Sequence, residues 1–365
     1  MDLEAIVQHL YFQKPKHMLY IHHTYCISAQ QDVFNNDINS LNDAIDKKYF
    51  AKEPGYAGIP PGILRRMGKA IRMGVGASLS IYKETSSLNG IIIGTANGGM
   101  EDCIKFLNQI VQYNEELLAP GNFVQSTNNA IAGQLGLLTA NKGYNITHVN
   151  RGLAFENAMM DAMMQLNENP ANSYLMGGVD ELSAFNYNIE KLAGAYKDET
   201  VSLKHLYKSN SPGSVAGEGA AMFIVNKFPV NAIAKVEAVS TLHSEDERAV
   251  CNQLKNFLLT HSLKKEKINL FLTGENGDNR FLKFYTACES LIDNDTAIGR
   301  FKHLCGEYPT ASSFALWLCC EILRTKTIPQ HIYKRKTQTT AVKNILLYNN
   351  YKGYQHSFML IKNCQ

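Results

Sequence analysis

The stretch NITHVNRGLAFENAMMDA, residues 145–162, places a short β-branched strand before a turn and an unusually apolar helix. Many enzymes carry a reactive side chain at such a turn, because the first-turn N–H groups and the helix dipole stabilise negative charge. Here the turn reads Asn150, Arg151 and Gly152, and none of these is a usual nucleophile. The turn therefore has the form of a reactive site without its reactive group.

The helix that follows this turn lacks a polar face. Between residues 152 and 166, Ala154, Ala158 and Ala162 recur every four residues, and the segment PTASSFALWLCCEILR at 309–324 is similarly apolar. A helix that is apolar nearly all round is buried on all sides. Small residues at spacing four let another helix approach closely. We expect the two helices to pack together in the centre, with two unrelated core helices as the alternative.

Strand-like runs alternate with helix-length segments along the chain. The first series of strand-like runs lies at residues 18–27, 91–99, 146–149, 174–178 and 220–226. The alternation restarts after Phe228 and Pro229, with runs at 232–242, 269–274, 344–350 and 354–362. This pattern predicts an α/β fold of mostly parallel sheets covered by helices. We expect two halves, at residues 1–228 and 229–365.

Composition limits the classes of partner and compartment. The chain has 365 residues, 45% hydrophobic and 19% charged, and a formal net charge of +3, which favours a globular protein over a nucleic-acid binder. Its eight cysteines have neither CxxC nor metal-type spacing, so a reducing cytoplasm fits best. The longest nearly apolar run, 310–323, is too short for a membrane span. We expect a soluble cytoplasmic protein.

Three segments together resemble the β-ketoacyl synthase family. They are GSVAGEGAAMFIV at 213–225, like the family's GEGA segment; YLMGGVDE at 174–181, like its GGxDE segment; and FVQSTNNAIAGQLGLL at 123–138, like its dimer-interface stretch. The order and spacing of these motifs extend the resemblance over roughly residues 18–362. The resemblance implies a thiolase-like fold, with two duplicated α/β halves in an αβαβα arrangement around buried central helices.

The family's nucleophile is a cysteine, and the resemblance places it where this chain has no thiol. Aligned without gaps from both flanking motifs, that position is Gly152, or Arg151 or Asn150 if the register slips. Condensation through an acyl-enzyme needs a side chain that attacks a thioester. Glycine has none, asparagine is a poor nucleophile, and arginine stays protonated because its pKa exceeds about 12. The resemblance therefore implies that no catalytic nucleophile is present.

The family's two histidines also have no counterpart. The first falls on Gly274 or Glu275, and the second falls on Glu307, while Lys302 matches a lysine that the family often keeps. A carboxylate at Glu307 would face the enolate formed by decarboxylation, and two like charges about 4 Å apart repel by roughly 4 kcal/mol at a dielectric near 20. A salt bridge between Arg151 and Glu307 is one hypothesis for how the old pocket is filled. The family's glycine-rich terminal loop is replaced by NNYKGYQH at 349–356.

Loss of all three catalytic groups implies a subunit retained for its architecture. The resemblance then narrows to chain-length-factor subunits, which pair with an active ketosynthase in type II polyketide and in aryl polyene or flexirubin pathways. Many of those factors carry glutamine at the nucleophile position, which this chain does not. We expect a heterodimeric subunit that is not an enzyme by itself and that shapes the acyl tunnel of its partner. We also expect it to bind an acyl carrier protein and to use no cofactor or metal.

The resemblance places the subunit interface along residues 123–138. The candidates for the tunnel wall or interface are Phe123, Gln125, Thr127, Asn128 and Asn129. The alternative is that residues 126–129 cap a helix that begins near Ala130, since Ser, Thr and Asn are strong N-caps. Both interpretations can hold together.

Other readings remain open from the sequence. The chain could be an active acyltransferase with a displaced nucleophile, for which Cys305 is the nearest thiol to the degenerate site, or a homodimer that binds only carrier protein or lipid. Residues 60–79 look like one Pro-initiated helix. Its basic residues could dock an acidic carrier protein, or form an ordinary solvated face; they are Arg65, Arg66, Lys69 and Arg72.

Overall fold

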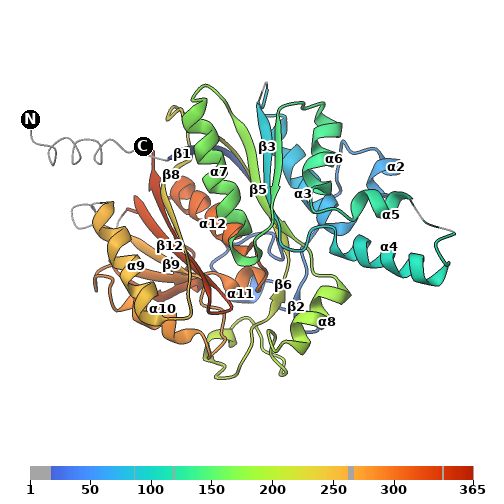
Figure 1. The fold of residues 1–365 in the computed structure, drawn as a ribbon. Helices are drawn as coiled ribbons and strands as arrows, with labels where there is room; N and C mark the ends of the chain where they lie inside the picture. Colours follow the sequence, from blue (N-terminus) through green and yellow to red (C-terminus); the bar gives the residue numbers. More distant parts are fainter. Residues whose placement is uncertain are drawn as a thin grey trace, which may run out of the picture.

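The computed structural model describes residues 18–85, 87–116, 118, 120–261, 267–338 and 341–364. A large sheet of 11 strands runs through it in the order β11-β10-β9-β12-β13-β8-β1-β7-β5-β3-β4 (Figure 1). The strands from the first half of the chain are β1 (Leu19–Ile27), β3 (Gly90–Gly94), β4 (Tyr144–His148), β5 (Tyr174–Asp180) and β7 (Gly219–Asn226).

The second half supplies the other side of this sheet. Its strands are β8 (Ala234–His243), β9 (Leu270–Thr273), β10 (Ala297–Arg300), β11 (Tyr333–Arg335), β12 (Asn344–Tyr351) and β13 (Gln355–Asn363). Each half has a parallel set, in which β3 pairs with β4 and β5, and β9 pairs with β10 and β12. Strand β1 pairs with both β7 and β8 and so joins the halves. The predicted boundary at 228 and 229 falls in the loop between β7 and β8, and the division into two domains stays a prediction.

Helices form the other layers of the molecule. Helices α7 (Ala154–Glu168) and α12 (Ala311–Thr325) lie in the centre and share one hydrophobic core with the facing strands of both halves. Helices α3 (Lys69–Tyr82) and α6 (Ala130–Thr139) pack on the outer face of the first half, and α9 (Glu247–Thr260) and α10 (Leu282–Glu289) on that of the second. The α/β fold with two buried central helices is confirmed.

The small residues of α7 explain how deeply this helix is buried. Ala154, Ala158 and Ala162 are all 0% exposed. Next to them, a Cβ atom on Gly94 of β3 would lie 2.5 Å from the carbonyl oxygen of Ala154. A glycine is therefore required in β3 for the helix to approach this closely. The same contact sets where the preceding turn lies above the sheet.

The predicted single helix at 60–79 is wrong. The segment forms α2 (Pro61–Leu64) and α3, which begins after Gly68. A Cβ atom at Gly68 would lie 2.2 Å from the Asp102 carboxylate, and the Gly68 N–H donates to Gln125 Oε1 over 2.6 Å. This close packing interrupts the helix. The Arg72 guanidinium forms a 2.9 Å ion pair with Glu53. Arg65 and Arg66 are exposed.

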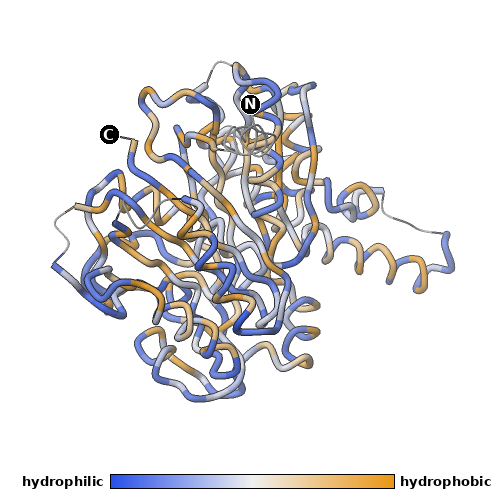
Figure 2. The backbone as a smooth tube through the Cα atoms, turned by 60° about the vertical axis from the view of Figure 1, so that its left-hand side comes forward, coloured by the Kyte–Doolittle hydropathy of each residue, from blue (hydrophilic) through white to orange (hydrophobic). Residues whose placement is uncertain are grey.

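One part of the molecule projects from the body. It is the arm formed by α4 (Met100–Gln112) and the short α5 (Pro120–Gln125), and its tube shows hydrophobic stretches along the helical part and a hydrophilic tip (Figure 2). Leu107 is 53% and Val111 79% exposed. The remaining helices are α8 (Ala184–Leu192) and α11 (Lys302–Cys305), and β2 (Lys48–Tyr49) pairs with β6 (Ala216–Gly217). Within the described ranges, no helix combines the length and apolar character that a membrane crossing needs.

Candidate functional site

The turn between β4 and α7 has no room for a side chain at Gly152. A Cβ atom there would lie 2.2 Å from Cβ and 2.4 Å from Cγ of Tyr351, which ends β12 in the other half. These atoms lie close to the backbone of Tyr351, so a rotation of its ring cannot relieve the clash. Tyr351 therefore fills the space at Gly152, the position where the resemblance predicts the family's nucleophile.

The hairpin between β12 and β13 forms hydrogen bonds with the same turn. The N–H of Gly152 donates to Gln355 Oε1 over 2.9 Å, and Gln355 Nε2 donates to Asn150 Oδ1 over 3.2 Å. The exposed Arg151 has a φ angle of 47°, in the left-handed region that residues with a Cβ rarely adopt. Its guanidinium donates to the Tyr354 hydroxyl over 3.4 Å, and this bond raises the arginine pKa. The first-turn N–H that could bind an anion is thus already engaged.

The residues that match the family's histidines belong to two separate networks. A Cβ atom on Gly274 would lie 2.4 Å from Asn349 Oδ1, so no larger residue fits there without movement. Glu275 forms ion pairs with Arg300, over 3.0 Å, and with Lys334, over 2.5 Å. Neither position offers a free base to a bound substrate.

Glu307 is neutralised by residues of its own half. The Lys302 ammonium lies 2.7 Å from Glu307 Oε1, and Asn276 Nδ2 donates to Glu307 Oε2 over 2.7 Å. The Lys302 side chain is 0% exposed, so the pair lies in a medium where a lone charge would be costly. The structure thus brings together two of the candidate positions, Glu307 and Lys302.

The hypothesis of an Arg151–Glu307 salt bridge is wrong. Among the described residues, no ion pair joins these two side chains, because Arg151 is exposed and lies against Tyr354 while Glu307 faces Lys302. The side chain of Tyr351, and not a salt bridge, fills the space next to Gly152. The sequence offered no sign of this contact, since residues 152 and 351 lie on opposite halves.

A small cavity of about 110 Å³ remains beside this site. Its wall includes Glu307, Asn276, Tyr351, Tyr196 and Glu181. Because Tyr351 both borders the cavity and blocks position 152, it separates the cavity from the turn. The space has several polar side chains in its wall and is large enough for several water molecules.

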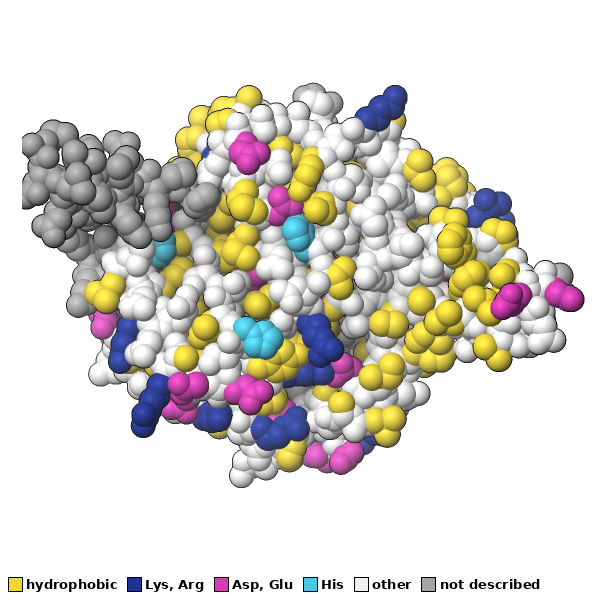
Figure 3. All heavy atoms as spheres, viewed as in Figure 1, with side chains coloured by type: hydrophobic (Ala, Val, Ile, Leu, Met, Phe, Trp, Pro, Cys, Tyr) yellow, Lys and Arg dark blue, Asp and Glu magenta, His cyan; other side chains and the backbone are white. Residues whose placement is uncertain are grey.

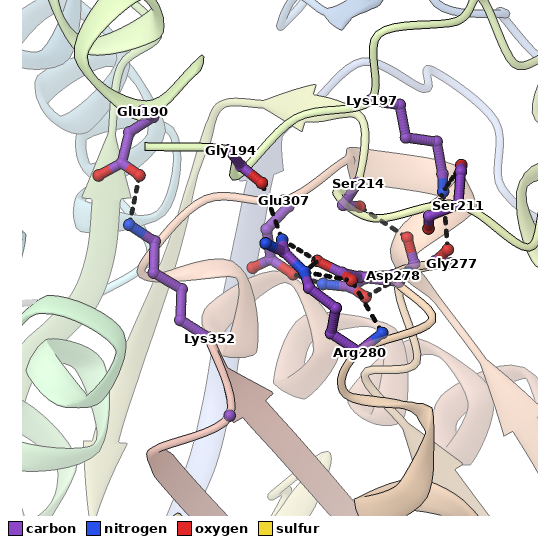
Figure 4. Close-up of polar contacts among 12 residues, drawn as sticks. Glu190, Gly194, Lys197, Ser211, Ser214, Gly277, Asp278, Arg280, Glu307 and Lys352 are labelled. Atoms are coloured by element: carbon purple, nitrogen blue, oxygen red, sulfur yellow. Dashed lines mark hydrogen bonds and ion pairs between the residues drawn. The ribbon is translucent and has the colours of Figure 1, made fainter. Parts of the chain in front are cut away.

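Charged groups also line this cavity, and Figure 4 shows their polar contacts. The Lys352 ammonium pairs with Glu190 of α8. Arg280 donates to the Gly194 carbonyl oxygen over 2.8 Å and to Asp278 Oδ1 over 2.9 Å. The Lys352–Glu190 and Arg280–Gly194 contacts therefore join the second half to the segment around α8.

A buried lysine fixes the neighbouring loops. Lys197 is 2% exposed, and its ammonium donates to the Ser211 and Gly277 carbonyl oxygens over 2.9 and 2.8 Å. Ser214 donates to the Asn276 carbonyl oxygen over 2.6 Å. Figure 4 shows how these bonds tie the segment after α8 to the loop that carries Asp278. They were not foreseen from the sequence.

The cysteine thiols are poorly suited to replace the missing nucleophile. Cys305, the nearest candidate in sequence, is 0% exposed, and burial raises its pKa. Cys319 and Cys320 are also 0% exposed within α12, and burial raises their pKa values as well. A thiol with a raised pKa is mostly protonated and unreactive at neutral pH.

A carboxylic acid lies in the first turn of the central helix α7. Glu156 is 0% exposed and accepts a hydrogen bond from Ser357 over 2.7 Å. Burial raises its pKa to about 7. It faces β13 rather than the cavity wall, so it belongs to the packed centre.

The candidate interface residues lie at the arm and the neighbouring sheet edge. Phe123 is 58% exposed and contacts Phe106 at a ring distance of 5.3 Å. The Gln125 side chain accepts a hydrogen bond from the Gly68 N–H. Thr127 and Asn128 are exposed. Asn129 accepts a hydrogen bond from Thr147 of β4 over 2.8 Å.

The N-cap alternative for this stretch is only partly confirmed. Helix α6 begins at Ala130, next to the expected capping residues. Asn129 precedes it, but no side-chain hydrogen bond from this residue caps the helix, because its amide oxygen binds Thr147 of the edge strand. The residue therefore links α6 to the sheet edge instead.

One family model matches part of the chain. Residues 42–201 match the family model described as beta-ketoacyl synthase, N-terminal domain. A comparison with curated proteins gives no match.

Three similar solved structures cover nearly the whole chain. A beta-ketoacyl synthase from Burkholderia phymatum STM815 has a TM-score of 0.74 and 13% identity, and covers 94% of this chain and 99% of its own. The ishigamide ketosynthase/chain length factor has the same score and identity, with 95% and 99% coverage. A type II PKS acyl-carrier protein in complex with its ketosynthase bound to the hexaketide gives 0.74, 11% identity, and 94% and 99% coverage. This chain therefore shares the fold of these solved structures, and its residues 42–201 match the beta-ketoacyl synthase family model.

Proposed function

We propose that this chain is the non-catalytic subunit of a ketosynthase pair, of the chain-length-factor type. It binds an active β-ketoacyl-carrier-protein synthase and shapes the pocket in which that partner's polyene, polyketide or fatty-acid-like product grows. The observation that carries the proposal is the contact between Gly152 and Tyr351, which leaves no space for a nucleophile. The likeness to a ketosynthase/chain length factor structure supports it.

The surroundings of Glu307 argue against decarboxylation on this chain. The family's histidines stabilise an enolate, whereas Glu307 would present a negative charge that its partner Lys302 already neutralises. Moving the lysine toward a substrate would leave the buried carboxylate without its counter-ion, which is strongly unfavourable. The pair is therefore a structural replacement for the histidine.

The narrow cavity argues against entry of an acylated carrier arm. Its volume of about 110 Å³ is below the roughly 300 Å³ at which ligand pockets usually begin. Residues that line it are held by the Lys352–Glu190 ion pair and by the hydrogen bond from Arg280 to the Gly194 carbonyl oxygen. Substrate would enter the partner's site instead.

The edge of the first half provides a surface for the partner. Among the described strands, β4 ends the sheet and has β3 as its one partner, so its outer backbone groups are available to another strand. Apolar side chains gather over the adjacent arm, on the right of Figure 3. The exposed apolar residues of the arm and the edge are Met100, Leu107, Val111, Phe123, Val124, Leu137 and Val149. A patch of this kind is typical of a protein interface.

Phe123 is the best candidate for a tunnel-wall residue. It combines 58% exposure with a fixed ring contact to Phe106, so it can enter a partner without reordering the arm. Gln125 is less suitable, because its amide holds Gly68 and the backbone of Arg66. A change at Gln125 would alter the arm itself.

The test is intact-mass analysis of the pair after incubation with malonyl- and acyl-carrier protein. We expect an acyl adduct on the partner ketosynthase and none on this chain. Peptide mapping would locate any adduct among the eight cysteines. An adduct on this chain would overturn the non-catalytic assignment and favour an acyltransferase with a displaced nucleophile.

A further inference from the structure

A basic groove lies at the end of the second half that is remote from the vestigial site. It has a volume of about 450 Å³. Its lining, which we call the lysine groove, consists of Lys235, Lys267, Asn269, Lys343, Asn344, Lys362 and Asn363. These residues lie at the starts of β8, β9 and β12 and at the end of β13. The cavity at Tyr351 lies at the opposite end of β12.

The strand ends share a local sequence pattern. A lysine is followed by an asparagine one or two positions later in three of them, at Lys267–Asn269, Lys343–Asn344 and Lys362–Asn363. Because β13 runs antiparallel to β12, the last pair meets the second at the same end of the sheet. The topology thus gathers three separate lysine-asparagine pairs in one place.

Two of the lysines face each other directly across the sheet. Lys362 of β13 is the register partner of Lys235 of β8, and on its other side it is the register partner of Asn344 of β12. Side chains that are directly opposite on neighbouring strands lie on the same face of the sheet. Both ammonium groups therefore lie beside the same groove.

The asparagines hold the base of the groove in place. Asn269 Oδ1 accepts hydrogen bonds from the N–H groups of Lys343, over 2.8 Å, and Asn344, over 2.9 Å. Asn344 Nδ2 donates to the Lys267 carbonyl oxygen over 3.0 Å. The backbone beneath the ammonium groups is therefore fixed before any ligand arrives, which lowers the entropy cost of binding.

The charge of the groove is only partly balanced. No carboxylate is among its lining residues. At its sides, Lys235 pairs with Glu237 and Lys267 pairs with Asp295. Among the described residues, no carboxylate pairs with the exposed Lys343. The groove thus keeps an excess of positive charge in a chain whose net charge is only +3.

The chemistry of the lining selects the class of ligand. Several ammonium groups around a shallow polar groove suit a compact anion with more than one negative charge. No aromatic ring lines the groove, so it has no platform for stacking a base. Lysine is a common point-charge partner of phosphate.

We propose that the lysine groove binds a phosphate-bearing anion of the di- or triphosphate type. The phosphates lie across the Lys235–Lys362 pair and are reached by Lys343 from β12. The site is independent of the proposed ketosynthase pairing, since it lies away from β4 and the arm. The phosphate groups belong either to a free soluble ligand or to a phosphorylated lipid headgroup.

The test is isothermal titration of the full chain with sodium tripolyphosphate. We expect saturable one-to-one binding that weakens as salt is added. The double variant Lys343→Gln/Lys362→Gln should bind roughly tenfold more weakly, because two charge-assisted contacts are lost. The matched control is Lys208→Gln/Lys326→Gln, which removes the same charge at exposed lysines outside the groove and should bind like the unmodified chain.

A second arm separates the two sources of phosphate. The same proteins are sedimented with phosphatidylcholine vesicles with and without phosphatidylinositol bisphosphate. Sedimentation with the phosphorylated vesicles that Lys343→Gln/Lys362→Gln abolishes would assign a lipid headgroup, whereas tripolyphosphate binding alone would assign a soluble ligand. Absence of binding in both arms, or equal binding by both double variants, would overturn the proposal. Unchanged thermal unfolding of the variants verifies that they fold.

Discussion

The buried centre and the exposed edge of the first half differ in what they retain. At the centre, Tyr351 fills the space at Gly152, and Lys302 neutralises Glu307. At the edge, β4 has one open side, and Leu137 and Phe123 are 79% and 58% exposed. The centre is thus closed by packing and an internal ion pair, whereas the edge keeps an uncovered apolar surface. A closed centre and an open edge are what we expect of a subunit that binds a catalytic partner and catalyses no reaction by itself.

The largest expected effect is at the buried ion pair of the centre. Lys302→Met leaves the Glu307 carboxylate buried with only Asn276 as a partner. We expect a loss of about 3 to 5 kcal/mol in the free energy of unfolding, measured by urea denaturation. The control Lys302→Met/Glu307→Leu removes both charges and should recover most of that loss. If Lys302→Met unfolded like the unmodified chain, the pair would have no structural role.

The next effect is at the turn itself. Gly152→Ala puts a Cβ atom 2.2 Å from Cβ of Tyr351, and we expect a loss of at least about 3 kcal/mol in the free energy of unfolding because the backbone must shift. Tyr351→Gly in the same chain opens the space and should make the added alanine tolerable. Thermal unfolding of the single and double variants measures the coupling. A tolerated Gly152→Ala in the presence of Tyr351 would contradict the packing described.

The buried acid of the centre predicts a dependence on pH. Burial raises the pKa of Glu156 to about 7 from an ordinary value of 4.5, so the folded chain binds this proton more tightly than the unfolded one. Stability should therefore fall as the pH rises from about 4.5 to about 7.

Glu156→Gln isolates this contribution. The variant should match the unmodified chain near pH 4.5 and exceed its free energy of unfolding by about 3 kcal/mol at pH 8, by the linkage between pKa and stability. Urea denaturation at the two pH values measures both numbers. A gap that did not grow with pH would show that Glu156 ionises normally.

The smallest effect is at the exposed surface. Phe123→Ala should leave the stability of the chain unchanged, but weaken its binding to an active ketosynthase by about 1 to 2 kcal/mol and shift product length. Phe228→Ala is the matched control, since Phe228 is 50% exposed but lies outside the arm. Affinity measurement and product analysis of the reconstituted pair provide the readouts. Equal behaviour of the two variants would remove the arm from the interface.

The architecture was largely readable from the sequence because it rests on local patterns. The alanines of α7 and the apolar run of α12 identified both central helices, and β-branched runs located most strands. The short edge-side strands β10 and β11 were not foreseen, since runs of four and three residues carry little periodic signal. The helix break at Gly68 was also missed, because it depends on the distant Asp102.

The contents of the site were less predictable. Sequence could locate the positions without nucleophile or histidine, and the roles assigned to them stay predictions. It could not reveal that Tyr351 fills the space at Gly152, or that Lys302 and not Arg151 neutralises Glu307. Both contacts depend on how segments distant in sequence pack together. Side-chain partners of this kind leave no periodic pattern.

The most direct test of the account is native mass spectrometry of this chain co-expressed with an active ketosynthase from the same genome. The account predicts a one-to-one complex, which Leu137→Glu and Val149→Glu at the exposed edge should dissociate. Two separate homodimers, with no mixed species at any ratio of the chains, would contradict it and leave an independent carrier-protein or lipid-binding protein as the better description.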